Sequence, residues 1–195
     1  MQSLRYYYKA FGLVFESDLL LPELLSIPAI IPDVKIRRGA VYATQLTGGF
    51  KKLYLPIRGV SCFLIQNGNE IIYQKEKEGH EDSLRLFLLG SAMGALLQQR
   101  GLIVLHGNAL SWNGEDCSIV VGDAGAGKST LAAQSLRKGA QVLTDDVSAI
   151  SLNAKGQILV MPAYPQLKLW QNAIDRKSTR LNSSHLKLSR MPSSA

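Results

Sequence analysis

The feature that most constrains the fold is the segment 122–130, which reads Gly-Asp-Ala-Gly-Ala-Gly-Lys-Ser-Thr. Its first eight residues have the spacing of a phosphate-binding loop, in which two glycines five positions apart precede lysine and serine. The apolar run 118–121 before it predicts a strand. Apolar residues at helical spacing over 128–138, followed by Gly139, predict a helix with a glycine cap. The order strand, loop, helix is typical of an α/β fold.

The composition of this loop suits phosphate. Glycines let backbone N–H groups turn inward, and the positive end of the following helix adds to the attraction. We expect Lys128 to supply a cation for the β- and γ-phosphates of ATP and the Ser129 hydroxyl to reach Mg²⁺. A glycine-rich turn that binds nothing is the alternative. The nucleotide-binding residues predicted in this way are Gly122, Asp123, Ala124, Gly125, Ala126, Gly127, Lys128, Ser129 and Thr130.

Two adjacent aspartates, Asp145 and Asp146, follow the next apolar run, 141–144. If that run is a strand of an open α/β sheet, its carboxyl end lies where such sheets bind ligands. Adjacent side chains on extended backbone point to opposite sides, so one carboxylate can hold Mg²⁺ while the other faces an acceptor hydroxyl. A solvated acidic turn is the alternative interpretation.

His106 follows a third apolar run, 102–105, and is predicted to lie at a strand end near the same cleft. By its chemistry alone, a hydrogen-bonded structural histidine is an equally simple interpretation.

Residues 1–80 form a β-rich N-terminal region with short strand-like runs at 11–15, 34–36, 60–65 and 71–73. Asn67-Gly68 predicts a type I′ hairpin turn, and Asn113-Gly114 predicts a hairpin between the runs 109–112 and 117–121. A buried helix, capped by Asp82 or Ser83, is expected to run to about Arg100 and to end at Gly101. Its apolar stretch, 86–97, is shorter than the roughly 20 residues that cross a bilayer.

The net charge of +7 would be typical of a protein that binds nucleic acid or a membrane surface, but four of these charges come from residues 175–195. We therefore expect neither partner. Cys62 and Cys117 lack metal-ligand spacing and a disulfide framework, and the N-terminus lacks the pattern of a secretory signal. Both observations favour a reducing cytoplasm.

The segment 175–185 looks like one reading-frame translation of a widely used sequencing-library adapter, which it matches at every position. Residues 175–195 are rich in serine, arginine and lysine and lack the apolar alternation seen before them. We interpret 175–195 as a non-native tail; a natural basic, disordered tail is the alternative.

Leu105-His106-Gly107, the loop 122–129, Arg137-Lys-Gly139 and Thr144-Asp145-Asp146 together resemble the catalytic domain of the HPr kinase/phosphorylase family. The segment 162–170, Pro-Ala-Tyr-Pro-Gln-Leu-Lys-Leu-Trp, is similar to shorter HPr-kinase-related proteins, including those of lasso-peptide and other peptide-maturation systems. The resemblance covers about residues 11–174. It implies an α/β, P-loop NTPase-like core of the HPr kinase and phosphoenolpyruvate carboxykinase type over 81–174, truncated at its C-terminus.

The resemblance also implies a function, an ATP- and Mg²⁺-dependent kinase that phosphorylates a serine of a protein or peptide. It assigns catalytic roles to Asp146 as proton acceptor, to His106 and to Lys128, with Ser129 and Asp145 at the metal. Ala124 and Thr130 depart from the residues common in the bifunctional enzymes, and the N-terminal region is shorter than theirs, so HPr is not implied as the substrate. The family's second signature would lie beyond Ile174, so phosphorylase activity is not implied either. A P-loop ATPase and a nucleotide-binding module without turnover remain alternatives, and homo-oligomerisation stays open.

Overall fold

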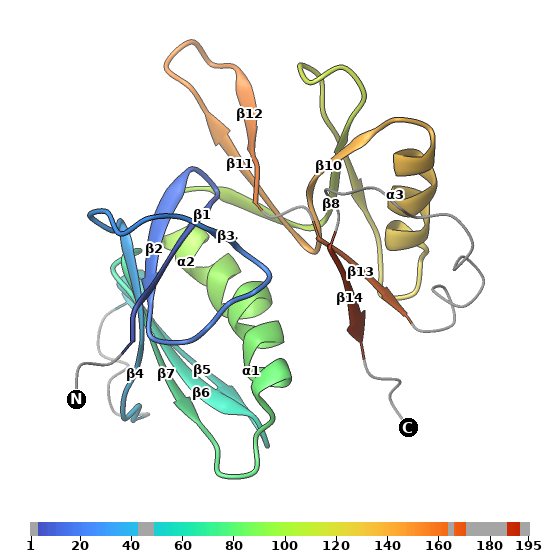
Figure 1. The fold of residues 1–195 in the computed structure, drawn as a ribbon. Coiled ribbons are helices and arrows are strands. Elements are labelled where there is room, and N and C mark those ends of the chain that lie inside the picture. Colours follow the sequence, from blue (N-terminus) through green and yellow to red (C-terminus); the bar gives the residue numbers. More distant parts are fainter. Residues whose placement is uncertain (1–3, 43–48, 164–165, 171–186, 192–195) are drawn as a thin grey trace. The chain divides into compact units, whose positions relative to one another are not determined.

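The N-terminal strands build one mixed sheet, seen in blue to cyan in Figure 1 of the computed structural model. The structure describes residues 4–42 and 49–163, and the backbone of 166–170 and 187–191. The order across the sheet is β3-β1-β2-β4-β7-β6-β5; β4 runs parallel to both β2 and β7, and the other neighbours are antiparallel. The strands are β1 (Tyr6–Ala10), β2 (Leu13–Ser17), β3 (Leu25–Ser26), β4 (Val34–Arg38), β5 (Lys52–Ile57), β6 (Ser61–Gln66) and β7 (Glu70–Lys75).

Two tight turns set the register of this sheet. The predicted hairpin at Asn67-Gly68 is confirmed, because both residues have the positive φ, 54° and 65°, that a type I′ turn needs. A second turn of this kind joins β1 to β2 at Phe11 and Gly12, with φ of 52° and 71°. The predicted run 11–15 is thus wrong at its start, since Phe11 is a buried turn residue and the strand begins at Leu13.

One helical segment packs against β6 of this sheet. It consists of α1 (Glu81–Phe87), a π-helical turn (Leu88–Ala92) and α2 (Met93–Gln99), and Gly101 ends it with a φ of 82°. The predicted cap is wrong, because the N-cap residue is His80 and makes no side-chain cap bond. Its buried face is apolar, as expected: Leu84, Leu88, Leu89, Met93, Leu96 and Leu97.

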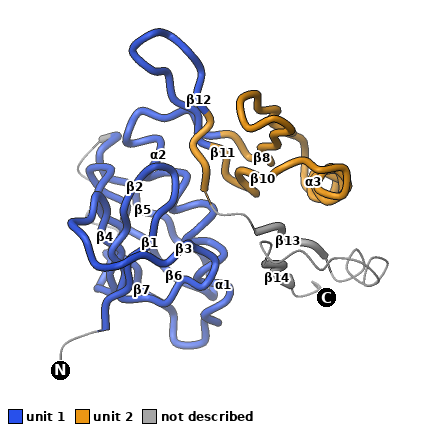
Figure 2. The backbone as a smooth tube through the Cα atoms, turned by 45° about the horizontal axis from the view of Figure 1, so that its top comes forward, with its two compact units in different colours: residues 1–104, 149–159 blue, residues 105–148, 160–195 orange. Residues whose placement is uncertain are grey.

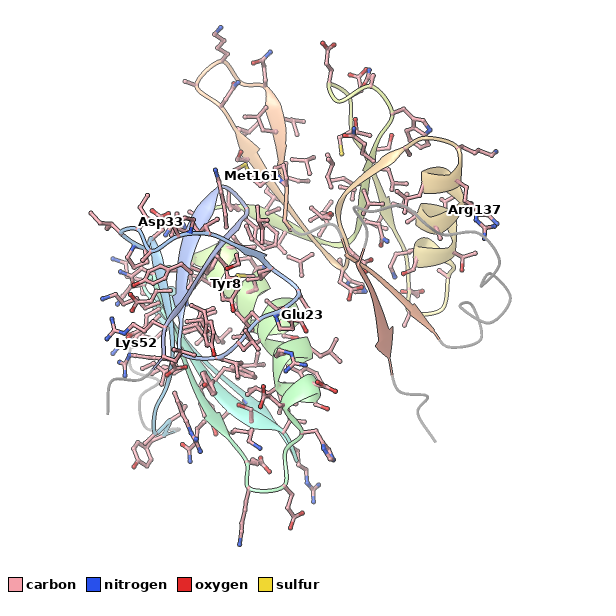
Figure 3. All side chains as sticks on the ribbon, viewed as in Figure 1. Tyr8, Glu23, Asp33, Lys52, Arg137 and Met161 are labelled. Carbon is pink, nitrogen blue, oxygen red and sulfur yellow. The ribbon has the colours of Figure 1, made fainter. Side chains whose placement is uncertain are left out.

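The chain divides into two compact units (Figure 2). The first comprises Met1–Val104 and Ala149–Leu159, and the second Leu105–Ser148 and Val160–Ala195. The sequence predicts a boundary at residue 80, whereas the helix 81–99 belongs to the first unit because its apolar face packs on the N-terminal sheet. Within the first unit, Tyr8 is buried and its hydroxyl accepts a hydrogen bond from the Leu21 N–H at 2.8 Å (Figure 3).

A second sheet follows the helix, in the order β10-β8-β11-β12, with β9 on the other side of β8. Its elements are β8 (Ile103–Ser111), β9 (Ser118–Val121), α3 (Lys128–Arg137), β10 (Gln141–Thr144), β11 (Val147–Leu152) and β12 (Ile158–Met161). The antiparallel pairing of β8 with β9 confirms the hairpin around Asn113-Gly114. The molecule is therefore a mixed α/β protein, richer in strand than in helix.

Two predicted strands of the second unit, 102–105 and 109–112, are in fact the single strand β8. Between them, Gly107 and Asn108 pair with β9, and the Gly107 N–H bonds to the Asp146 carbonyl on the other side, so the strand continues. His106 therefore lies inside a strand and not at a strand end, which corrects the sequence expectation.

Two further short strands, β13 (Gln166–Trp170) and β14 (Lys187–Met191), pair in parallel. β14 lies within the segment 175–195, and the adapter-like residues 175–185 lie outside the described residues. Within the described part of the chain, no helix is both long and apolar enough to cross a bilayer.

Candidate functional site

The loop 122–127 joins β9 to α3, so the predicted order of strand, loop and helix is confirmed. Gly125 and Gly127 have φ of 83° and 91°, in the left-handed region that side chains other than glycine rarely adopt. The Ala126 N–H donates to the Asp123 carbonyl at 3.1 Å and closes the turn. The loop residues are exposed. The sequence pattern thus produces a curled, accessible loop at a helix start.

Lys128 is the first residue of α3 and is only 9% exposed. Its Nζ donates to the carbonyls of Gly122 at 2.7 Å and Asp123 at 3.0 Å. The ammonium is therefore held against the first two carbonyls of the loop. A phosphate in the loop would compete for these donors, since an ammonium has three protons to share.

The N-terminus of α3 is open to a ligand. Gly127 is its N-cap residue and provides no side chain to bind the first N–H groups of the helix. Such N–H groups and the helix dipole attract anions. Ser129 is half-buried and Thr130 is exposed in this first turn. At the other end of the helix, Arg137 is exposed in the last turn (Figure 3), where a cation is favourable.

β8 lies between this loop and the paired aspartates. Gly107 is opposite Val121, the last residue before the loop, and its N–H donates to the Asp146 carbonyl at 3.2 Å. A Cβ at Gly107 would come within 2.4 Å of the Val120 carbonyl oxygen, so only glycine fits. Because neighbouring strands are about 4.8 Å apart, the loop entrance and the Asp146 backbone are separated by roughly 10 Å.

Asp145 and Asp146 directly follow the strand β10, as the sequence predicts. β10 is antiparallel to β8, and the two aspartates form a break between β10 and β11. The Val147 N–H donates to the Asp145 carbonyl at 2.8 Å while Asp146 has a φ of 65°. This is a γ-turn with positive φ, a rare and strained conformation that here centres on Asp146.

The two carboxylates still have different surroundings, although the expected reason, an extended backbone, is wrong. The Asp145 side chain is fully buried and accepts a hydrogen bond from Asn108 Nδ2 at 2.9 Å. Asp146 is half-buried. The left-handed turn therefore separates a shielded carboxylate from one that is partly accessible to solvent.

Buried hydroxyls fill the gaps that the break opens in the sheet. Thr144 Oγ1 accepts from the Ala109 N–H at 3.1 Å, and Ser148 Oγ donates to the Gly107 carbonyl at 2.8 Å. The two hydroxyls also bond to one another. These contacts replace backbone hydrogen bonds, so the irregular segment is held in place.

His106 reaches the same turn from β8. Its ring is exposed, and Nδ1 lies 3.1 Å from the Asp146 carbonyl oxygen. A carbonyl only accepts hydrogen bonds, so Nδ1 carries the proton when this bond forms, and Nε2 of a neutral ring is then an acceptor. The structure thus brings His106 to Asp146 through the backbone oxygen.

Sequence reasoning missed Asn108, Thr144 and Ser148. The available signal was a polar side chain inside an apolar strand, as in His-Gly-Asn at 106–108, because a buried polar group needs a partner. The partner itself, Asp145, lies 37 residues away in the sequence, so no local pattern identifies it.

The residues present fit a nucleotide with Mg²⁺. The loop offers left-handed glycines, an uncapped helix start and a buried lysine, all within one stretch of chain. Mg²⁺ takes one or two carboxylates together with phosphate oxygens and waters, for which Asp145 and the Ser129 hydroxyl are suitable donors. Among the described residues no group of three or more His, Cys, Asp or Glu side chains gathers as a metal site.

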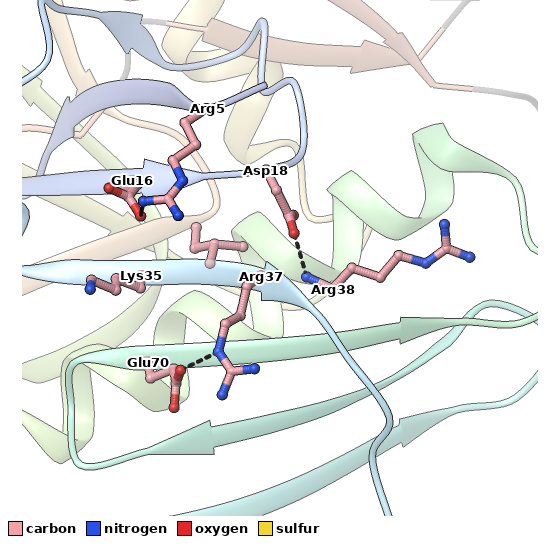
Figure 4. A pocket seen from close by; sticks show the side chains of 8 residues that line it. Arg5, Glu16, Asp18, Lys35, Arg37, Arg38 and Glu70 are labelled. Atoms are coloured by element: carbon pink, nitrogen blue, oxygen red, sulfur yellow. Dashed lines mark hydrogen bonds and ion pairs between the residues drawn. The ribbon is translucent and has the colours of Figure 1, made fainter. Parts of the chain in front are cut away.

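A second polar cleft, of about 410 Å³, lies on the sheet of the first unit (Figure 4). Its carboxylates are already paired: Glu16 with Arg5 at 3.1 Å, Glu70 with Arg37, and Asp18 with the Arg38 N–H at 2.7 Å. The cleft is lined by Arg5, Glu16, Asp18, Lys35, Ile36, Arg37, Arg38 and Glu70. Mutual pairing of its charges makes it a weaker candidate than the loop.

In comparisons with known proteins, no protein-family model, no curated protein and no solved structure matches this chain.

Proposed function

We propose that the chain binds ATP with Mg²⁺ at the loop 122–130 and transfers the γ-phosphoryl group to a hydroxyl of a protein or peptide. The observation that carries this proposal is the position of Gly107, which is opposite the residue before the loop and hydrogen-bonded to Asp146. Phosphate donors and a partly accessible carboxylate therefore flank one strand. That arrangement suits phosphoryl transfer, in which positioning and charge stabilisation supply most of the catalysis.

The roles of the side chains follow from their surroundings. Asp146 accepts the proton of the attacking hydroxyl, since it is the more accessible of the two carboxylates. Lys128 and the first N–H groups of α3 offset charge on the phosphates, and Ser129 and Asp145 hold the metal. The bond from the hydroxyl oxygen to the γ-phosphorus forms while the bond to the β,γ-bridging oxygen breaks, which releases ADP.

The finer parts of the proposal rest on the resemblance to the HPr kinase family. These are a serine as the acceptor, a P-loop NTPase-like core over 81–174 and a catalytic contribution from His106. The cytoplasm is the proposed location, because ATP is available there and Cys62 and Cys117 are free thiols.

The proposal is tested with Asp146→Asn, because asparagine tolerates left-handed backbone but accepts no proton. We expect ATP affinity within about twofold of the wild type, and phosphoryl transfer lowered by roughly 10²-fold or more. Transfer is measured by mass spectrometry on a library of peptides that contain one serine, beside a matched library with alanine. Glu115→Gln, an exposed acid in the β8–β9 hairpin, is the matched control.

Lys128→Ala should weaken both ATP binding and transfer, whereas the exposed Lys138→Ala should change neither. An Asp146→Asn protein that keeps its transfer rate would refute the base assignment. Phosphate release without phosphopeptide would favour the ATPase alternative, and ATP binding without turnover would favour a nucleotide-binding module.

A further inference from the structure

Asn108 is a buried polar residue in the middle of β8 that the proposed function has not yet used. Its side chain is fully buried, and Nδ2 donates to Asp145 Oδ1 at 2.9 Å. Because a carboxylate oxygen only accepts, this bond fixes which end of the amide faces Asp145. The other end, Oδ1, is buried and has no hydrogen-bond partner among the described residues.

The position of Asn108 in the sheet places it on the same side as α3. Side chains two residues apart on a strand share a face, so Asn108 lies on the same face as Leu110. Leu110 packs against Ala132 and Ala133 of α3. β9 runs from the level of Leu110 to that of Gly107, and α3 then returns over the sheet. Asn108 therefore lies on the face of β8 that α3 covers.

Asn108 is thus bonded to one proposed metal ligand, Asp145, on the face of β8 that α3 covers through Leu110. An unpartnered buried acceptor destabilises a fold, so a polar group at this position needs another reason than packing. Metal-binding carboxylates are commonly oriented by a further hydrogen bond, and removal of that bond typically weakens metal binding by about 10- to 100-fold.

We propose that Asn108 is a positioning residue of the Mg²⁺ site, whose amide N–H holds Asp145 and whose Oδ1 accepts a hydrogen bond from a water of the metal. This inference rests on the proposed nucleotide site and deepens it. It explains why a buried amide, and not an apolar side chain of similar size, contacts Asp145.

The test measures ATP affinity of the full chain with Mg²⁺ and with EDTA, so it needs no catalytic turnover. For Asn108→Leu we expect an unchanged ATP affinity in EDTA, within about twofold. A Mg²⁺ titration of the chain with ATP should show an affinity for Mg²⁺ lowered by about 10- to 100-fold. Asn108→Ser, which keeps a shorter donor and acceptor, should lose less. Ser111→Ala, which removes the hydrogen bond that the buried Ser111 accepts from the Gly114 N–H, should bind Mg²⁺ like the wild type.

The outcomes separate this inference from the proposed function. A wild-type chain that binds no ATP in either condition would refute the proposed function itself. A wild type with Mg²⁺-dependent binding, together with an Asn108→Leu variant that keeps it in full, would overturn only the role of Asn108. If Asn108→Leu fails to fold, Asn108→Ser decides, because wild-type Mg²⁺ affinity there contradicts the inference and a loss of about threefold or more supports it.

Discussion

Several unusual features of the molecule occur together at one residue, Asp146. It adopts a φ of 65°, lies at the centre of a γ-turn, and its carbonyl accepts from both the Gly107 N–H and His106 Nδ1. Aspartate and asparagine tolerate the left-handed region better than most residues, but the conformation still carries strain. The bonds from β8 keep the turn in place. Strain of this kind clusters at functional sites, which agrees with the catalytic role proposed for this residue.

Glu70 in the charged cleft gives a pH-dependent prediction at the same scale. Burial raises the pKa of its carboxyl, but the hydrogen bonds from Arg37 and Gln66 outweigh it, so the pKa lies below the ordinary value of 4.5. A depressed pKa contributes stability above the unfolded pKa and loses it as pH falls through the folded pKa. Glu70→Gln should therefore lower the free energy of unfolding at pH 7, by less than about 1 kcal/mol, and differ little at pH 3.

Urea denaturation at both pH values measures this effect, with the exposed Glu78→Gln as control. An equal difference between Glu70→Gln and wild type at pH 7 and pH 3 would contradict the assigned cause.

Among the elements, β8 has the largest influence on the candidate site. It is nine residues long and pairs with β9 on one edge and with β10 and β11 on the other. The positions of the loop, of His106 and of the two aspartates all depend on this strand. α3 covers it with the small side chains Ala132 and Ala133, which let helix and sheet approach closely. The site thus depends on one strand and one helix more than on the loop alone.

Two glycines, one just after a helix and one inside a helical segment, should respond oppositely to substitution by alanine. Gly139 ends α3 with a φ of 94°, and the Ala140 N–H donates to the Ser135 carbonyl at 3.0 Å, as in a Schellman cap. Gly90 lies inside the helical segment 81–99. At neither position would an added Cβ meet a heavy atom of the surroundings within 4 Å, so backbone preference alone decides.

Gly139→Ala should lower the free energy of unfolding by about 1–2 kcal/mol, and Gly90→Ala should raise it by about 0.5–1 kcal/mol. Urea denaturation of each variant beside the wild type measures both. Changes of the same sign would show that packing, and not backbone conformation, dominates at one of the two positions.

At the scale of the whole molecule, the candidate site belongs to one unit. The loop, His106, Asn108 and both aspartates lie between Leu105 and Ser148, inside the second unit. A ligand that binds only the folded form stabilises what it binds, by about 2.7 kcal/mol at a hundred times its Kd. The effect of nucleotide should therefore be confined to the part of the chain that forms the site.

Hydrogen exchange tests this expectation. ATP with Mg²⁺ should slow the exchange of amides in 105–148, above all in β9 and α3, and leave the β5–β7 strands of the first unit unchanged. Lys128→Ala is the control that should remove the protection. Equal protection of β5–β7 would mean that the two units respond to nucleotide together.

Features set by local chemistry could be predicted from the sequence. The glycine spacing of the loop, the Asn67-Gly68 turn and the Gly139 cap each depend on the φ preferences of a few adjacent residues. Helical periodicity likewise identified α3 and the apolar face of the segment 81–99. In these places the information needed for the structure lies within a few residues.

The tertiary structure alone decided how these pieces form a site. The bonds from Asn108 to Asp145 and from His106 to Asp146 join residues 37 and 40 positions apart. Both bonds depend on the antiparallel pairing of β8, which spans two predicted strands. They also depend on the break between β10 and β11, where the aspartates leave the extended backbone. No local pattern encodes such pairings, because strand register is set by hydrogen bonds and packing between distant segments. The sequence alone determined the glycine-rich turn before α3, and the sheet determined which residues lie opposite it.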